Sequence, residues 1–121
     1  MATLAPTLTL TSTNASSDTL SISVTDNLTV TAPSVNVARQ SIATTGEFNI
    51  LTAADNTSIS YVYVKNMDSS NIITLKDDAG NNFLDLGGGE FAFFPVKGSI
   101  GLEATANTAA CVLEYAYWTK S

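Results

Sequence analysis

The regular alternation of aliphatic and hydroxyl side chains in the N-terminal third is the strongest constraint on the fold. Residues 7–11 read Thr-Leu-Thr-Leu-Thr, and residues 20–25 read Leu-Ser-Ile-Ser-Val-Thr. Because successive side chains of a strand point to opposite faces, each segment would have one apolar face and one hydroxyl face. This pattern is typical of strands in a half-buried antiparallel sheet.

Short segments of strand character recur along the whole chain, separated by clusters of the turn formers Asn, Asp and Gly. No stretch has a convincing helical period. We expect short strands near residues 7–11, 19–25, 28–32, 34–42, 47–51, 58–66, 72–76, 82–86, 90–96, 100–104 and 111–118. Strands at a spacing of roughly ten residues with such turns predict an all-β fold, either a sandwich or a barrel.

A change in composition near residue 45 suggests how the chain is organised. A chain of 121 residues is expected to form one structural domain. Residues 1–45 are rich in Thr and Ser and lack aromatic residues, whereas every Phe, Tyr and Trp follows. We expect residues 46–121 to form the compact core. Residues 1–45 would supply either extra strands at its edge or an extended arm that packs on another subunit.

The charge of the chain restricts its partners. Eleven acidic and five basic residues give a net charge of −6. Nucleic-acid binding needs clustered Lys and Arg, so neither nucleic acid nor an anionic membrane is expected as a partner. No apolar segment is long enough to span a membrane, and the N-terminal residues do not resemble a signal peptide, so we expect synthesis in a cytoplasm. Only 13% of the residues are charged, which weakens self-repulsion and favours assembly.

The sequence contains few residues that could carry chemistry. Histidine is absent, and the single cysteine, Cys111, is expected to be a small buried side chain because it lies in an apolar segment. The acidic segment 77–81 lacks the ligand spacing of a calcium loop, and no helix follows the glycine run 87–89 to complete a phosphate site. Both are expected to be turns. We therefore expect no enzymatic activity, and no catalytic, cofactor-binding or metal-binding residue.

The aromatic side chains indicate a surface for contacts with other molecules. If Glu114 and Lys65 face water, then Trp118 shares the outer face of the last strand, and Tyr61 and Tyr63 lie on the outer face of theirs. Exposed Tyr and Trp are enriched at interfaces. The expected interface residues are these three and the aliphatic face of the first predicted strand: Leu8, Leu10, Tyr61, Tyr63 and Trp118. Loops or the N-terminal strands of the same subunit could instead cover the aromatic residues.

About half of the chain resembles a known class of proteins. The resemblance lies in Ile73-Thr74-Leu75, in Leu86-Gly87-Gly88-Gly89-Glu90-Phe91-Ala92-Phe93-Phe94-Pro95, in Ile100-Gly101-Leu102-Glu103-Ala104 and in Cys111-Val112-Leu113-Glu114-Tyr115. These segments resemble those of small virion structural proteins of tailed bacteriophages. The resemblance implies a β-sandwich of jelly-roll type that acts as a capsid decoration, or cement, protein. Such proteins are without cofactor and often trimeric, and they bind between neighbouring subunits of the major capsid protein.

The expected function is therefore that of a homo-oligomeric virion protein on the capsid surface, made in the cytoplasm of a host bacterium, with a trimer favoured. An extended N-terminal arm would allow one subunit to add a strand to the sheet of another. Two other functions remain open at this point. A phage tail fibre, adaptor or tube component would share the composition, and a carbohydrate-binding β-sandwich module would use Tyr61, Tyr63 and Trp118 to stack against sugars.

Overall fold

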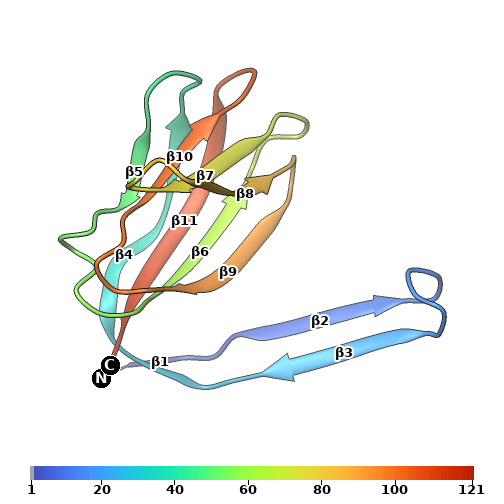
Figure 1. Cartoon of the computed structure of the whole chain (residues 1–121). Helices are drawn as coiled ribbons and strands as arrows, with labels where there is room; N and C mark the ends of the chain where they lie inside the picture. Colours follow the sequence, from blue (N-terminus) through green and yellow to red (C-terminus); the bar gives the residue numbers. More distant parts are fainter. Residues whose placement is uncertain (1) are drawn as a thin grey trace.

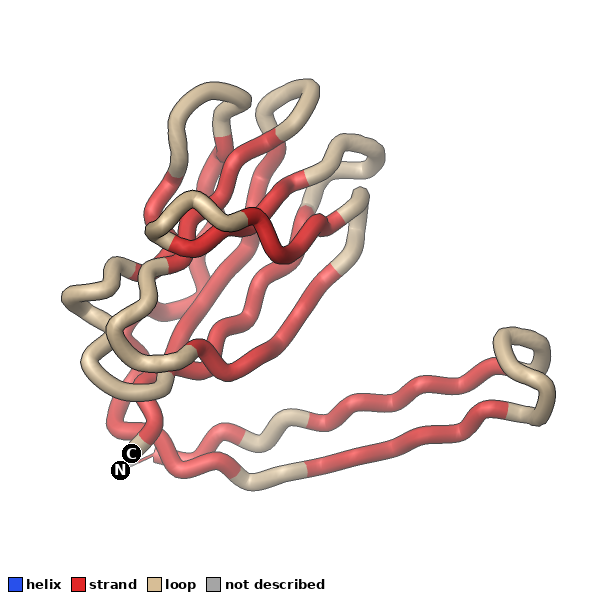
Figure 2. The backbone as a smooth tube through the Cα atoms, in the orientation of Figure 1, coloured by secondary structure: helices blue, strands red, loops and turns tan. Residues whose placement is uncertain are grey.

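A computed structural model describes residues 2–121, apart from the side chains of residues 32–35. The described chain contains strands and loops but no helix, and so no helix that could cross a membrane (Figure 2). The eleven strands are β1 (Ala2–Leu4), β2 (Thr7–Ser12), β3 (Leu20–Thr25), β4 (Leu28–Ile42), β5 (Phe48–Leu51), β6 (Ser60–Asn66), β7 (Ile73–Asp77), β8 (Asn82–Leu86), β9 (Phe91–Val96), β10 (Leu102–Ala106) and β11 (Cys111–Lys120). The prediction of an all-β fold is confirmed.

Nine of these strands form two antiparallel sheets that pack face to face. One sheet has the order β1-β4-β11-β6-β9, and the other has the order β5-β10-β7-β8 (Figure 1). The alternation predicted from the sequence places one face of each sheet in a shared apolar core. Side chains from both sheets are fully buried there: Val62, Val64, Ile73, Leu75, Ala104 and Leu113.

Two buried asparagines fix the loops at either end of β6. The amide nitrogen of Asn66 donates to the carbonyl oxygens of Asn71 and Leu86, at 2.8 and 2.9 Å. Its amide oxygen accepts the backbone N–H of Asp68. Asn56, just before β6, bonds in the same way to the carbonyl oxygens of Lys97 and Ile100. Both side chains are fully buried, and all these hydrogen bonds join them to the backbone of neighbouring loops and strands.

The segment expected to form two strands, residues 28–32 and 34–42, is one long strand, β4. The residue between the two expected strands, Pro33, pairs with Trp118 of β11 where the register between the two strands shifts. A bulge lets a strand continue past a residue that has no N–H to donate, so the proline does not end β4. Because β4 lies between β1 and β11, and its Val30 and Ile42 are buried, the sandwich begins before residue 46.

The remaining two strands leave the sandwich. β2 and β3 form a separate antiparallel hairpin that extends away from the two sheets (Figure 1). It continues the ribbon made by β1 and the start of β4, after an interruption at Pro6 and Asp26. The N–H of Asp26 donates to the carbonyl oxygen of Pro6 there, at 3.2 Å. We call the hairpin from Thr7 to Thr25 the arm.

Candidate interaction surface

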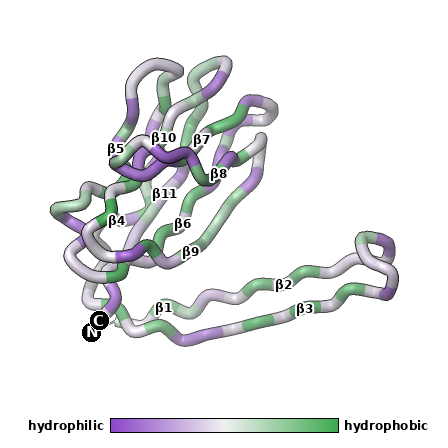
Figure 3. The backbone as a smooth tube through the Cα atoms, viewed as in Figure 1, coloured by the Kyte–Doolittle hydropathy of each residue, from purple (hydrophilic) through white to green (hydrophobic). Residues whose placement is uncertain are grey.

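The arm has one aliphatic face and one hydroxyl face, as the alternation in its sequence dictates. Residues directly opposite each other in an antiparallel pair place their side chains on the same face. The pairs of the first face are Leu8 with Val24, Leu10 with Ile22, and Ser12 with Leu20; those of the second are Thr7 with Thr25, Thr9 with Ser23, and Thr11 with Ser21. Figure 3 shows the apolar positions recurring along both strands.

The aliphatic face of the arm is open to solvent. Leu8, Leu10, Ile22 and Val24 are 44%, 45%, 39% and 55% exposed. β2 and β3 pack mainly against each other, and neither strand contains a charged residue. Isolated apolar residues are common on protein surfaces, but a contiguous apolar face usually marks a contact site.

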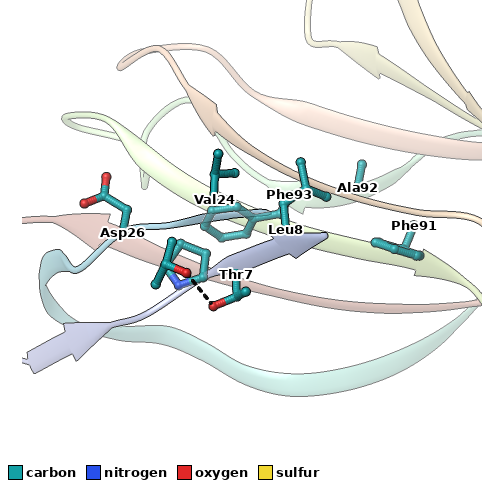
Figure 4. Close-up of a pocket in the computed structure, with 9 residues that line it drawn as sticks. Thr7, Leu8, Val24, Asp26, Phe91, Ala92 and Phe93 are labelled. Carbon is teal, nitrogen blue, oxygen red and sulfur yellow. Dashed lines mark hydrogen bonds between the residues drawn. The ribbon is translucent and has the colours of Figure 1, made fainter. Parts of the chain in front are cut away.

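A groove separates the base of the arm from the edge of the five-stranded sheet. It has a volume of about 550 Å³ and is lined by Pro6, Thr7, Leu8, Val24, Thr25, Asp26, Phe91, Ala92 and Phe93. Leu8 and Val24 from the arm lie beside Phe93 from β9 (Figure 4). Farther from its base the arm diverges from the sheet, and its tip has no neighbour in the sandwich (Figure 1). The groove is thus a wedge with two apolar walls.

The wall on the sheet side belongs to β9, the last strand of its sheet. Phe94 and Val96 point into the core, so Phe91, Phe93 and Pro95 alternate onto the outer face. Phe91 is 65% exposed and Phe93 is 39% exposed. We call Phe91, Phe93 and Pro95 the β9 strip. It contains no charged residue, like the aliphatic face of the arm.

The expected aromatic residues lie on the same outer face of the five-stranded sheet. Tyr61 lies opposite Pro95 and Trp118, and Tyr63 lies opposite Phe93. The ring of Tyr61 stacks on that of Phe93, with centroids 6.2 Å apart. Tyr61 is only 8% exposed. It lines a second hollow together with Pro6, Asp26 and Leu28, which lie around the base of the arm. The same subunit therefore covers this tyrosine in part.

Glu114 joins Tyr63 and Arg39 on this face. The Tyr63 hydroxyl donates to Glu114 Oε1 at 2.7 Å, and Arg39 Nε donates to Glu114 Oε2 at 3.1 Å. Burial and the hydrogen bond to Glu114 raise the pKa of Tyr63 to about 12. The bonds from Tyr63 and Arg39 hold the pKa of Glu114 below its ordinary value. Both carboxylate oxygens are engaged, so this cluster fixes the side chains of Tyr63, Arg39 and Glu114 relative to one another on the sheet.

The segments considered for chemistry form turns. Asp77 accepts the backbone N–H groups of Ala79 and Asn81, at 3.0 and 2.8 Å, in the hairpin between β7 and β8. These hydrogen bonds, with the one from the Asn81 side chain, lower the pKa of Asp77. Gly88 faces the backbone of Ser69, which a Cβ atom would approach to 2.4 Å, so the glycine run allows two loops to touch. Within residues 2–121, no group of three potential metal ligands lies together.

Cys111 is 1% exposed, as predicted from its apolar surroundings. Burial raises the pKa of its thiol, and the Sγ atom lies 3.3 Å from the carbonyl oxygen of Ala109. A buried protonated thiol is a poor nucleophile.

The structure groups the predicted interface residues into two sets. Leu8 and Leu10 lie on the arm, and Tyr61, Tyr63 and Trp118 lie on the outer face of the sheet. Only Leu8 reaches the groove that separates the two sets. Sequence reasoning missed Ile22 and Val24, although their alternation matches that of residues 7–11. It also missed Phe91 and Phe93, because the adjacent Phe94 left the outward face of the strand undefined.

No family model, no curated protein and no solved structure matches the chain.

Proposed function

We propose that this protein is a non-enzymatic structural protein that assembles with copies of itself, and that it decorates the capsid of a bacteriophage. The arm carries the first part of the proposal. Its two strands contain no charged residue, and Leu8, Leu10, Ile22 and Val24 of its aliphatic face are exposed. A two-stranded hairpin alone is marginally stable in water, so an arm of this kind needs a second surface to cover it.

We also propose that the sandwich is a jelly roll. The consecutive strands β4 to β11 divide into the orders β4-β11-β6-β9 and β5-β10-β7-β8. Jelly rolls have eight strands in two such sheets, and they occur in viral capsid proteins and in lectins. This order is compatible with a capsid role, but a fold alone does not select a function.

The proposed place on the capsid rests on the resemblance of segments within residues 58–118 to phage virion proteins. In this setting the partners are sister copies, with a trimer favoured, and the major capsid protein, whose neighbouring subunits the protein would hold together. The protein would be made in the cytoplasm of the host bacterium and end on the capsid surface. Its low charge supports close packing among many copies, because like-charged surfaces repel.

A tail fibre, adaptor or tube component is the second candidate, because the arm would serve assembly there equally well. A carbohydrate-binding module is less favoured by the positions of the aromatic residues. Tyr61 is 8% exposed and already stacked on Phe93, and the Tyr63 hydroxyl is engaged by Glu114. These two rings do not form an open platform on which a sugar could stack.

Antibody labelling of purified phage particles, viewed by electron microscopy, tests whether the protein lies on the capsid. The proposal predicts label over the heads. Label confined to tails would support the tail component, and particles without label would contradict both assignments. Light scattering coupled to gel filtration tests self-assembly separately, because it needs only the purified protein.

A further inference from the structure

We propose that the arm of one subunit docks its aliphatic face onto the β9 strip of a second copy of this chain. This inference rests on the proposed self-assembly and names the two surfaces that meet. Each subunit would give one arm and receive another. The contact is therefore between two different patches, and the assembly is closed when the rotation from one subunit to the next returns to the first subunit.

The first argument is that one chain cannot cover its own arm. Only Leu8 and Val24, near the base, line the groove with β9. Leu10 and Ile22 lie farther out, where the arm has diverged from the sheet (Figure 1). The β9 strip is also left uncovered by its own chain, because Phe91 is 65% exposed. Two apolar surfaces are thus exposed on the same molecule and held apart by its geometry.

The second argument is the area that the contact would bury. The exposed parts of the four aliphatic side chains and of Phe91 and Phe93 add up to about 500 Å² of apolar surface per subunit. A stable interface buries about 800 Å² on each partner, of which roughly 60% is apolar. Giving one arm and receiving one would therefore bury, in total for each subunit, about the apolar area of one stable interface. A single arm on a single strip would provide about half.

The third argument is electrostatic. Eleven of the sixteen charged residues are acidic, so a contact between two copies is most favourable where the surfaces contain none of them. Neither β2, β3 nor β9 contains a charged residue. These strands therefore bring no charged side chain of their own into the contact, where an unpaired buried charge would cost several kcal/mol.

The contact is expected to join faces of sheets and not edges. β9 is an edge strand, but Pro95 lacks the N–H that an added strand would require, and proline commonly protects such edges. Within the arm, β2 and β3 already pair with each other. Packed sheets lie about 10 Å apart, so the Cα atoms of Leu10 and Phe91 from two copies would lie at about that distance.

The test uses two versions of the full chain with different tags, expressed together. One carries Leu10→Cys and the other carries Phe91→Cys. The native Cys111 stays in place because it is buried, and the wild-type chain serves as the control for its reactivity. A bismaleimide that spans about 10 Å is then added, and denaturing gels with detection of both tags report which chains are joined.

We expect a cross-link between the two differently tagged chains. The yield should be at least tenfold above that of the matched pair with Thr9→Cys, which places the thiol on the hydroxyl face of the same strand.

A link only between two Leu10→Cys chains would show that arms contact each other and not the β9 strip, and would overturn the inference. A single chain carrying both cysteines that cross-links to itself when diluted would show that the arm folds back on its own sheet, and would also overturn the inference. An oligomer without any of these links contradicts the inference alone, whereas a monomer contradicts the proposed self-assembly as well.

Discussion

Leu10 and Ile22 lie directly opposite each other on the arm, yet they remain 45% and 39% exposed. Cross-strand aliphatic pairs stabilise a hairpin, but this pair also needs a cover from outside the hairpin. The sandwich supplies no such cover at that distance from the base. The proposed contact with a second copy would cover this pair.

Replacing Leu10 with Asp should break self-assembly without unfolding the sandwich. Burying one leucine contributes about 1.5–3 kcal/mol, so dissociation constants should rise by about tenfold to a hundredfold. Sedimentation velocity over a concentration series measures the change. The matched control is Thr9→Asp, which adds the same charge to the hydroxyl face of the same strand. Equal weakening by both variants would mean that charge in the arm matters and its aliphatic face does not.

Removing the arm should leave the sandwich folded. Leu4 and Leu28 are paired neighbours in β1 and β4, so a two-residue Asn-Gly turn can replace residues 5–27 and close the ribbon there. We expect urea denaturation to give a free energy of unfolding within about 1 kcal/mol of that of the intact monomer. Deletion of residues 1–45 is not an equivalent test, because it also removes β4 with the buried Val30 and Ile42. Loss of cooperative unfolding in the variant with residues 5–27 replaced would show that the arm supports the fold.

The strands of the sandwich could be predicted from the sequence because local information defines them. Alternation and turn residues placed most of the strands within two residues of their observed bounds. The prediction that Cys111 is buried is confirmed, and Leu113, two residues later on the same face of β11, is buried with it. The continuity of β4 through Pro33 could not be predicted, since it depends on a bulge opposite β11.

The interaction surface could be predicted only in part. The two faces of β2 follow from alternation alone, but the alternation of β4 is similar, and β4 lies inside a sheet. Whether a strand joins the sandwich or leaves it depends on pairing between residues far apart in the chain. The same holds for Phe91 and Phe93, whose outward position follows from the register with β6.

Replacing Asn66 with Ala should destabilise the sandwich by about 2–4 kcal/mol, because three backbone groups lose the hydrogen bonds that its buried side chain makes to them. Those groups are the carbonyl oxygens of Asn71 and Leu86 and the N–H of Asp68. Urea denaturation measures this loss, and the dependence of the unfolding free energy on urea concentration should stay unchanged. Asn82→Ala is the control, since this exposed residue should change stability by less than about 0.5 kcal/mol. Similar losses in both variants would contradict the anchoring role of Asn66.

The contact between Tyr63 and Glu114 should be visible in an alkaline titration. The pKa of Tyr63 is raised from 10.0 to about 12, so between these pH values the unfolded chain loses the proton and the native chain keeps it. The contribution of Tyr63 to stability is therefore full below pH 10 and is lost as the pH rises through about 12. Tyrosinate absorbance, compared with that of Tyr63→Phe, isolates this group. Glu114→Gln should bring the pKa of Tyr63 back toward 10, and an unchanged titration would rule out Glu114 as a cause of the shift.

The molar mass of the purified protein in solution, measured by light scattering during gel filtration, tests the central claim most directly. The chain has a mass of 12.7 kDa. The account predicts that the intact protein elutes at a small whole-number multiple of this mass, and that the variant with residues 5–27 replaced elutes as a single chain. A single-chain mass for the intact protein at high concentration, or an unchanged oligomer after loss of the arm, would contradict it.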